Sequence, residues 1–272
     1  MNRIRPLRSL RARRARVDSA LPSWSVIHPA SGHSWSGRTV VVTGAAGLLG
    51  REMVEALVLR GAVVHAVDRA DLRLAEGHSD RVIIHVADVA HQASVDQLVR
   101  SLSQTAASLD ALIHCVGHNA YVPAGQPVSA DTWHRVLSDN LIAPALVTQA
   151  LLPLLEHVPL AGVVMVTSIN GRISSQWPDY AAAKAGLGKL TRDLATQFAP
   201  LGVRVNAVAP GWFVRSDAAS HGTPDASASL TGAASPVEAI VNAVLFLADP
   251  ALSPCTTGQE LAVDGGIELG VQ

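Results

Sequence analysis

The stretch of sequence that decides the fold is Thr39-Val40-Val41-Val42-Thr43-Gly44-Ala45-Ala46-Gly47-Leu48-Leu49-Gly50. A run of β-branched residues leads into a glycine-rich turn, and helical periodicity follows over residues 49–60. Gly44 permits a tight turn, and Gly50 lets the helix pack closely against the strand. The N–H groups and the dipole at a helix start attract anions such as a pyrophosphate. The stretch therefore predicts a strand, a phosphate-binding loop and a helix.

Beyond this stretch, short apolar runs alternate with longer segments of helical periodicity. The apolar runs are continuous, which is typical of strands that are buried on both faces of a parallel sheet. We therefore expect an α/β protein with a doubly wound Rossmann fold, in which helices cover both faces of about seven parallel strands. The predicted strands span residues 39–42, 63–67, 82–86, 111–116, 162–167, 203–208 and 260–263, and the predicted helices span residues 49–60, 95–107, 132–155, 180–199 and 236–248.

Two connections depart from this alternation. The link over residues 69–81 is short and polar, so we expect its helix to be reduced or absent. The stretch over residues 212–235 is rich in Ala, Ser, Gly, Thr and Asp, and loops of that length are usually lids or disordered segments.

The composition limits the classes of function. A length of 272 residues with 49% hydrophobic residues suits one large domain. The net charge of −1 gives no drive toward nucleic acid or an anionic membrane, and charges or glycines interrupt the apolar runs. Of the two cysteines, Cys115 lies in an apolar run and is expected to be a buried free thiol. These features predict a cytoplasmic protein that binds neither nucleic acid nor membrane.

The first residues have a different composition. We expect residues 1–36 to be a disordered, arginine-rich tail and residues 37–272 to form the single catalytic domain. The tail also fits a transit-like peptide, a nucleic-acid-binding segment, or a stretch translated from a misassigned start. Its arginines are Arg3, Arg5, Arg8, Arg11, Arg13, Arg14 and Arg16.

An acidic residue, Asp68, ends the second predicted strand and is followed by Arg69. A carboxylate there accepts hydrogen bonds from the adenosine ribose, but it repels a 2′-phosphate by about 4 kcal/mol at 4 Å and an effective dielectric near 20. Arg69 favours the phosphate instead. We expect NAD in preference to NADP. Asp88, which follows the third strand and precedes Val89, either meets the adenine edge or caps the next helix.

Tyr180 and Lys184 lie four residues apart in Tyr180-Ala181-Ala182-Ala183-Lys184. This spacing puts both side chains on one face of a helix. An adjacent cation lowers the pKa of a tyrosine, so that the phenol exchanges protons with a carbonyl or an alcohol while a hydride moves at carbon. The pair therefore predicts a catalytic centre, with a packed tyrosine beside a surface lysine as the alternative.

Two polar residues complete the candidate set. Ser168 closes a strand, where its hydroxyl is placed to hold a substrate oxygen or to form a turn. Asn140 lies inside an apolar helix and either holds a water that relays protons to Lys184 or has a structural role. His114, His118 and His134 do not share a helical face, so we predict no metal site.

With these residues in order, the chain resembles the short-chain dehydrogenase/reductase family, in its shorter single-domain branch, over residues 38–269. The resemblance implies that Asn140, Ser168, Tyr180 and Lys184 are catalytic, and that the protein is a homodimer or homotetramer built on helices 132–155 and 180–199. The matching motifs are Thr43–Gly50, Asp88-Val89, Asn140, Ser168, Tyr180 with Lys184, Asn206-Ala207-Val208-Ala209-Pro210-Gly211, and Thr257-Gly258-Gln259 with Val263-Asp264-Gly265-Gly266. The predicted cofactor contacts are Gly44, Gly47, Leu49, Gly50, Asp68, Arg69, Asp88, Val89, Gly117, Asn140, Tyr180, Lys184, Pro210, Gly211, Phe213 and Ser216.

Four features depart from the family pattern. Leu48 stands where this branch usually has glycine, and the resulting spacing is similar to that of the sugar-nucleotide-modifying branch. The motif after the fourth strand reads His114-Cys115-Val116-Gly117, so the asparagine that normally braces the sheet is missing. Ser216 is the nearest match to the threonine that usually follows Pro-Gly, and the lid before Pro236 is short.

Three functions are compatible with the sequence. The first is an NAD(P)-dependent oxidoreductase that transfers a hydride between the cofactor and a small secondary alcohol or ketone. The second is a sugar-nucleotide epimerase or dehydratase of the same fold, which the glycine spacing favours and the lack of a substrate domain after Val263-Asp264-Gly265-Gly266 disfavours. The third is a dinucleotide-sensing protein without turnover, which the presence of both Tyr180 and Lys184 disfavours.

Overall fold

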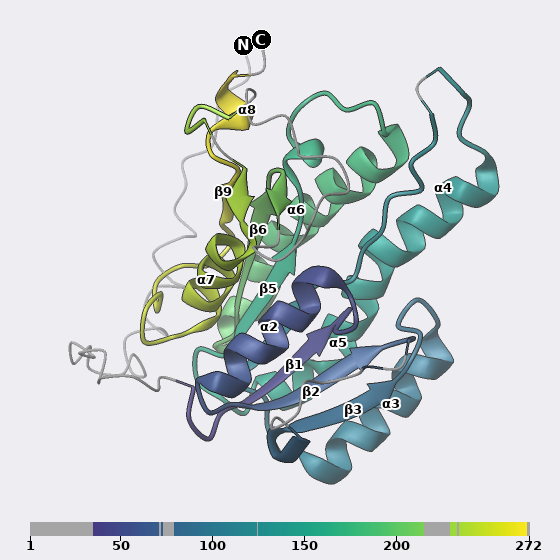
Figure 1. Cartoon of the computed structure of the whole chain (residues 1–272). Coiled ribbons are helices and arrows are strands. Elements are labelled where there is room, and N and C mark those ends of the chain that lie inside the picture. Colours follow the sequence, from purple (N-terminus) through teal and green to yellow (C-terminus); the bar gives the residue numbers. More distant parts are fainter. Residues whose placement is uncertain are drawn as a thin grey trace, which may run out of the picture.

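A computed structural model describes residues 35–70, 72, 79–123, 125–214, 229–232 and 234–270. Seven parallel strands form one sheet in the order β3-β2-β1-β4-β5-β6-β9, so the predicted doubly wound α/β fold is confirmed (Figure 1). The strands are β1 Thr39–Thr43, β2 Val63–Asp68, β3 Val82–Val86, β4 Ala111–His114, β5 Gly162–Val166, β6 Arg204–Pro210 and β9 Glu260–Val263, and a separate two-stranded pair joins β7 Phe213–Val214 to β8 Ser235–Pro236.

The order of the strands creates a crevice beside β1. The chain proceeds outward from β1 to β2 and β3 and then crosses to the other side of β1 to form β4. Val41 of β1 is in register with His65 of β2 and with Leu112 of β4. The connections that leave the carboxyl ends of β1 and β4 therefore diverge, and ligands of open α/β sheets bind at such a reversal point.

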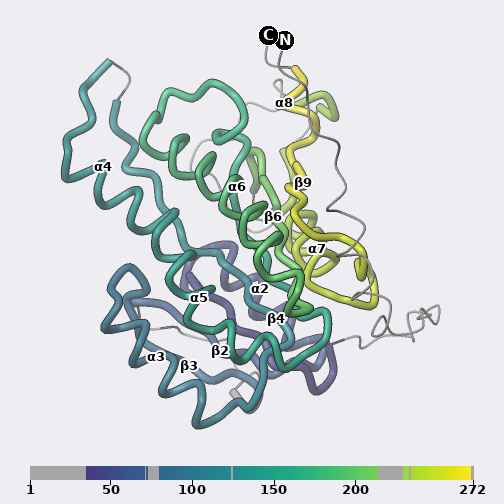
Figure 2. The backbone as a smooth tube through the Cα atoms, turned by 180° about the vertical axis from the view of Figure 1, so that it is seen from behind, coloured from purple at the N-terminus to yellow at the C-terminus, as the bar shows by residue number. Residues whose placement is uncertain are grey.

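Helices cover both faces of the sheet (Figures 1 and 2). The helices α2 and α7 pack together on one face, where they bury Met53 and Val244 against β-branched residues such as Val42. The helices α3, α5 and α6 cover the opposite face with a second core that includes Leu151 and Leu187. The bounds are α2 Leu48–Leu59, α3 Gln92–Thr105, α4 Ala130–Leu137, α5 Ala143–Leu155, α6 Pro178–Phe198, α7 Val237–Ala248 and α8 Ile267–Gly270.

The predicted helix over residues 132–155 is two helices joined by a π-helical turn. α4 and α5 flank the turn Ser138–Ile142, which the sequence pattern did not reveal. The whole stretch, Ala130–Leu155, is the one described helical segment that is long and apolar enough to cross a membrane. Its apolar residues Val147, Leu151 and Leu155 are fully buried in the core against the sheet, as in a core helix.

His114 links neighbouring elements of the sheet in the segment where the sequence lacks the expected asparagine. The Nε2 of His114 lies 2.8 Å from Oγ1 of Thr148, whose hydroxyl donates to the carbonyl of Pro144. Because that hydroxyl is already a donor, Nε2 carries the proton, and Nδ1 accepts from Oγ1 of Thr43 over 3.1 Å. The imidazole thus ties β1 and β4 to α5, and burial lowers the pKa of His114 to about 3, which keeps it neutral.

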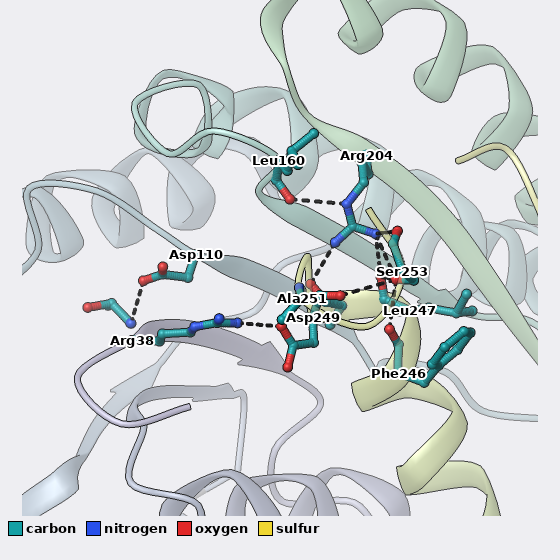
Figure 3. A network of polar contacts seen from close by, with 11 residues as sticks. Arg38, Asp110, Leu160, Arg204, Phe246, Leu247, Asp249, Ala251 and Ser253 are labelled. Atoms are coloured by element: carbon teal, nitrogen blue, oxygen red, sulfur yellow. Dashed lines mark hydrogen bonds and ion pairs between the residues drawn. The ribbon is translucent and has the colours of Figure 1, made fainter. Parts of the chain in front are cut away.

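A buried arginine secures the opposite, amino-terminal edge of the sheet (Figure 3). Arg204 at the start of β6 donates to the carbonyls of Leu160, Leu247 and Ala248 at 3.1, 2.7 and 2.8 Å. The carbonyls of residues 247 and 248 end α7, where a cation also meets the negative end of the helix dipole. Nearby, Arg38 pairs with the fully buried Asp249 at 2.8 Å. This polar network closes one edge, while the carboxyl edge carries the connecting loops.

The folded domain begins before the predicted boundary at residue 37. Trp35 is 2% exposed and belongs to the core, and the guanidinium of Arg38 lies 5.2 Å from its ring centroid. The rest of the predicted tail, residues 1–34, and most of the predicted lid, residues 215–228, lie outside the described residues. Of the polar link over residues 69–81, the structure describes one short 3₁₀ turn, Ser79–Arg81.

Candidate active site

The glycine loop has the geometry that its sequence predicts. Gly44 has a φ of +71°, and a Cβ there would lie 2.6 Å from the backbone nitrogen of Val116. A Cβ on Gly50 would collide with the carbonyl oxygen of Gly44, so this glycine allows α2 to pack on the loop. The carboxylate of Asp68 accepts from the N–H of Ala46 at 2.9 Å and thereby ties the loop to the end of β2.

A cavity of about 260 Å³ opens beside this loop at the reversal point of the sheet. Leu49 does not line it, because its side chain is buried in the core, and Gly50 does not line it either, because it packs against Gly44. The predicted cofactor residues that do line the cavity are Gly44, Gly47, Asp68, Arg69, Asp88, Val89 and Gly117.

The cavity carries an acidic pattern that the sequence only partly predicted. Its lining includes the carboxylates of Asp68, Asp88 and Asp139. Asp139 pairs with His118 at 3.0 Å and with Arg69 at 3.6 Å, so it links segments that follow β2 and β4. Asp88 accepts from the N–H of Ala90 at 3.0 Å, which shapes the turn before α3. Of the two predicted roles for Asp88, helix capping is excluded, because His91 occupies the N-cap position of α3.

Tyr180 and Lys184 lie in the first two turns of α6, as the spacing predicts. Lys184 is only 3% exposed, and its ammonium donates to the carbonyl of Val166 at 2.9 Å. The same nitrogen lies 5.6 Å from the centroid of the Tyr180 ring. Among the described residues, no carboxylate forms an ion pair with Lys184. Both groups are thus held together at the carboxyl end of β5.

The pKa of Tyr180 departs from the expectation. Burial raises the pKa of Tyr180 to about 12, while its hydrogen bond with Ser168 acts in the opposite direction. The prediction of a lowered pKa is therefore wrong, because desolvation of the phenolate is the largest effect on this group. Burial also lowers the pKa of Lys184 to about 8. Tyr180 consequently keeps its proton at neutral pH, which suits a proton donor.

Asn140 occupies the π-helical turn, a feature that is frequent at functional sites. Its amide donates to the carbonyls of His118 and Val136, both at 2.9 Å. Within the described part of the chain nothing bonds its buried Oδ1. A Cβ on Gly117 would lie 2.6 Å from this oxygen and 2.9 Å from the ammonium of Lys184. Because Gly117 has no side chain, Oδ1 of Asn140 and Nζ of Lys184 both occupy the space beside it. The Oδ1 is free there to accept a hydrogen bond from a water or a ligand.

Ser168 follows β5 and is 7% exposed. Its oxygen accepts from the N–H of Asn170 at 3.2 Å, and its hydroxyl group also bonds Tyr180. Ser168 is thus a turn residue that also neighbours Tyr180, and its predicted contact with a substrate oxygen stays a prediction.

The structure describes three of the four predicted cofactor contacts at and beyond the end of β6. Pro210 ends β6, and a Cβ on Gly211 would lie 2.7 Å from the Cα of Asp264. Phe213 begins β7 and packs against the core. None of the three lines the cavity beside the glycine loop. Ser216 lies outside the described residues.

Three aromatic residues near Tyr180 were not predicted from the sequence. Tyr121, Trp177 and Trp212 form a chain of edge-to-face contacts. They are far apart in the sequence, so no local pattern identifies them. The position of Trp177 three residues before Tyr180 was the one available signal.

The site fits a dinucleotide that reaches from the cavity to the candidate residues Asn140, Ser168, Tyr180 and Lys184. The glycine loop leaves space without Cβ atoms, Asp68 ends β2, and the free Oδ1 of Asn140 lies beside Lys184 across Gly117. These features are those of a nicotinamide dinucleotide site.

Comparison with known proteins identifies the same family. The family model described as enoyl-(acyl carrier protein) reductase matches residues 44–268. Cis-4-hydroxycyclohexanecarboxylate dehydrogenase of Sinomonas cyclohexanicum is 33% identical over 250 residues, which cover 86% of this chain and 98% of that protein. An uncharacterized oxidoreductase of Schizosaccharomyces pombe is 33% identical over 242 residues, which cover 86% and 92% of the two chains.

A solved structure gives the same result in three dimensions. The short-chain dehydrogenase of Leptospira borgpetersenii with bound NAD⁺ superposes with a TM-score of 0.77 at 25% identity and covers 89% of this chain and 100% of its own. Together with the parallel sheet, the glycine loop and the Ser-Tyr-Lys arrangement, these matches lead to one conclusion. The chain belongs to the short-chain dehydrogenase/reductase family and is an oxidoreductase with a nicotinamide dinucleotide as its cofactor.

Proposed function

We propose that the protein interconverts a secondary alcohol and a ketone, with Tyr180 as the proton donor and acceptor. The observation that carries this proposal is the ammonium of Lys184, which is buried beside the ring of Tyr180 without a carboxylate partner among the described residues. An unpaired buried charge is costly, and such groups concentrate at functional sites. A packed tyrosine beside a surface lysine, the alternative raised by the sequence, does not fit this burial.

Each residue of the set has a role that its contacts support. The hydroxyl of Ser168 would hold the substrate oxygen beside Tyr180, with which it already shares a hydrogen bond. Tyr180, which is protonated at neutral pH, would donate its proton to that oxygen during ketone reduction. Bound NAD(P)H would supply the hydride to the carbonyl carbon. Lys184 would hold the nicotinamide ribose, and Asn140 would hold a water at its free Oδ1 that returns a proton toward Lys184.

The charges of the cavity support NAD in preference to NADP. Three carboxylates line the cavity, and a 2′-phosphate beside Asp68 would meet like charge. Arg69 is the residue that would pair with this phosphate, but its guanidinium points to Asp139, 3.6 Å away. To bind NADPH, Arg69 would have to leave that partner.

We also propose that the protein is located in the cytoplasm. Cys115 and Cys255 are both free, and burial raises the pKa of the Cys115 thiol to about 12, which makes it unreactive. Two cysteines that form no disulfide support a reducing, cytoplasmic location. The homodimer or homotetramer that the family resemblance implies is part of the same proposal.

The proposed activity is tested by assaying secondary alcohols with NAD⁺ and NADP⁺, and ketones with NADH and NADPH, at 340 nm. We expect turnover with at least one pair. Tight binding of NADH without turnover across a broad panel would instead favour a dinucleotide-sensing protein.

The cofactor preference is tested by titrating NADH and NADPH separately, with nicotinamide fluorescence as the readout. The wild type should bind NADH at least about tenfold more tightly. Asp139→Asn should narrow this gap, because it releases Arg69 toward the 2′-phosphate. The control Asp131→Asn, at an exposed position in the first turn of α4, should leave the gap unchanged. Equal binding of both dinucleotides by the wild type would refute the preference.

A further inference from the structure

Three aromatic side chains from separate segments meet near the catalytic set. Tyr121 lies in the loop after β4, Trp177 directly precedes α6, and Trp212 follows β6. The ring centroids of Tyr121 and Trp177 are 5.6 Å apart at an interplanar angle of 83°, and those of Trp177 and Trp212 are 6.2 Å apart at 69°. Such edge-to-face geometry is the favourable arrangement of aromatic pairs. We call these three residues the aromatic cluster.

The aromatic cluster is open to solvent although its surface is apolar. Tyr121 is 70% exposed and Trp212 is 44% exposed, while aromatic residues make up only 4% of the chain. Contiguous exposed apolar surface usually marks a place where something binds. Tyr121 also has a φ of +51°, in a region that residues other than glycine rarely adopt, and strain of this kind is frequent at ligand clamps.

The aromatic cluster lies next to the proton donor. Trp177 is three residues before Tyr180, and its carbonyl accepts from the N–H of Ala181 at 2.9 Å, so it belongs to the turn that begins α6. The phenol of Tyr121 is close enough to that of Tyr180 to contribute to its raised pKa. In Figure 1 the loop that precedes α4 and the beginning of α6 lie at the same end of the sheet. A molecule held by Tyr180 would therefore lie close to the aromatic cluster.

We infer that the aromatic cluster is the substrate platform and that the substrate is an apolar cyclic ketone or alcohol. This inference rests on the proposed function, because it takes Tyr180 as the group that meets the reacting oxygen. An apolar ring buries its surface against the faces of Trp177 and Trp212. A polyhydroxylated chain would instead press its hydroxyls against aromatic carbon and lose their hydrogen bonds to water. Ser168 and Tyr180 supply polar groups for one reacting oxygen.

Kinetics on two ketones test the inference. Cyclohexanone and dihydroxyacetone are reduced in parallel, each with NADH and with NADPH. We expect kcat/KM for cyclohexanone to exceed that for dihydroxyacetone by at least about tenfold. Trp212→Ala should lower kcat/KM for cyclohexanone about tenfold, mainly through KM, and should change the value for dihydroxyacetone less than about twofold. The matched control is Phe246→Ala, which removes an aromatic side chain that is 41% exposed on α7 and should change neither value.

A binding measurement separates this inference from the proposed function. Cyclohexanone should shift the tryptophan emission of the wild type to shorter wavelength, and the shift should be reduced in Trp212→Ala. If no ketone is reduced and the shift behaves in this way, the proposed function fails and the aromatic cluster is a binding site for apolar rings without the assigned reaction. If both ketones are reduced equally and Trp212→Ala leaves their ratio unchanged, the proposed function stands and the platform is overturned. A change of oligomeric state in Trp212→Ala by analytical ultracentrifugation, with the ratio unchanged, would assign the aromatic cluster to a subunit interface and overturn the inference as well.

Discussion

Replacing Gly117 by alanine tests whether turnover depends on the positions of Oδ1 of Asn140 and Nζ of Lys184. A Cβ at this position would lie 2.6 Å from Oδ1 of Asn140 and 2.9 Å from Nζ of Lys184. An ordinary contact of a Cβ is at least about 3.4 Å, so the two groups must each retreat by roughly 0.5–0.8 Å. Displacements near 1 Å in a catalytic site cost on the order of 10²-fold in rate. We therefore expect Gly117→Ala to lower kcat by about 10- to 100-fold.

The same substitution should affect stability much less than turnover. The atoms that the new methyl group meets are the ends of two side chains, which can move without displacing the backbone. The melting temperature by circular dichroism should therefore fall by only a few degrees. Gly186→Ala is the matched control, because this glycine lies on α6 and the nearest atoms to its Cβ belong to the flexible side chain of Leu141, the closest at 3.0 Å. A folded Gly117→Ala protein with wild-type kcat would refute the dependence of turnover on the positions of Asn140 and Lys184.

Three further predictions concern stability and pH. Arg204→Leu leaves the last carbonyls of α7 without their side-chain donor, so it should lower the free energy of unfolding by about 3 kcal/mol in urea titrations. The control Arg192→Leu replaces an exposed arginine and should change this free energy by less than about 0.5 kcal/mol. Burial lowers the pKa of His65 from 6.5 to about 4, so its contribution to the free energy of unfolding is complete above pH 6.5 and is lost as pH falls toward 4. Protonation of this one group should lower the free energy of unfolding by about 2 kcal/mol at pH 5. A melting temperature that stays constant from pH 7 to 5 would contradict the assignment. The raised pKa of Tyr180 also predicts how the rate depends on pH. Alcohol oxidation needs the phenolate and should accelerate with rising pH, whereas ketone reduction should not. Parallel pH–rate profiles for the two directions would exclude Tyr180 as the titrating group.

The fold was predictable because its signals are local. The run Val40-Val41-Val42 and the glycines after it identify a strand, a loop and a helix without reference to the rest of the chain. Continuous apolar runs then indicate strands covered on both faces. The π-helical turn at Asn140 was not predictable, because α4 and α5 share one uninterrupted helical periodicity. The bracing role of His114 was also hidden, since it depends on Thr43 and Thr148 from two other elements.

The site was predictable only where its residues are close in the sequence. Tyr180 and Lys184 are four residues apart, so helical geometry alone brings them together. The ion pairs of Asp139 with Arg69 and His118 join segments from different parts of the fold. The direction of the pKa shift of Tyr180 was wrong at the sequence level for a similar reason. The proximity of Lys184 is visible in the sequence, whereas the burial that raises the pKa of Tyr180 arises from tertiary packing.

The central claim is that Tyr180 exchanges the proton with the substrate oxygen. Its most direct test is the kcat of Tyr180→Phe on any substrate that the wild type accepts, measured on protein shown to be folded by circular dichroism. The substitution keeps the ring and removes the hydroxyl, so NADH affinity and the fold should be preserved, while kcat should fall by about 10²- to 10⁴-fold or more. A folded Tyr180→Phe protein that binds NADH and turns over at the wild-type rate would contradict the claim.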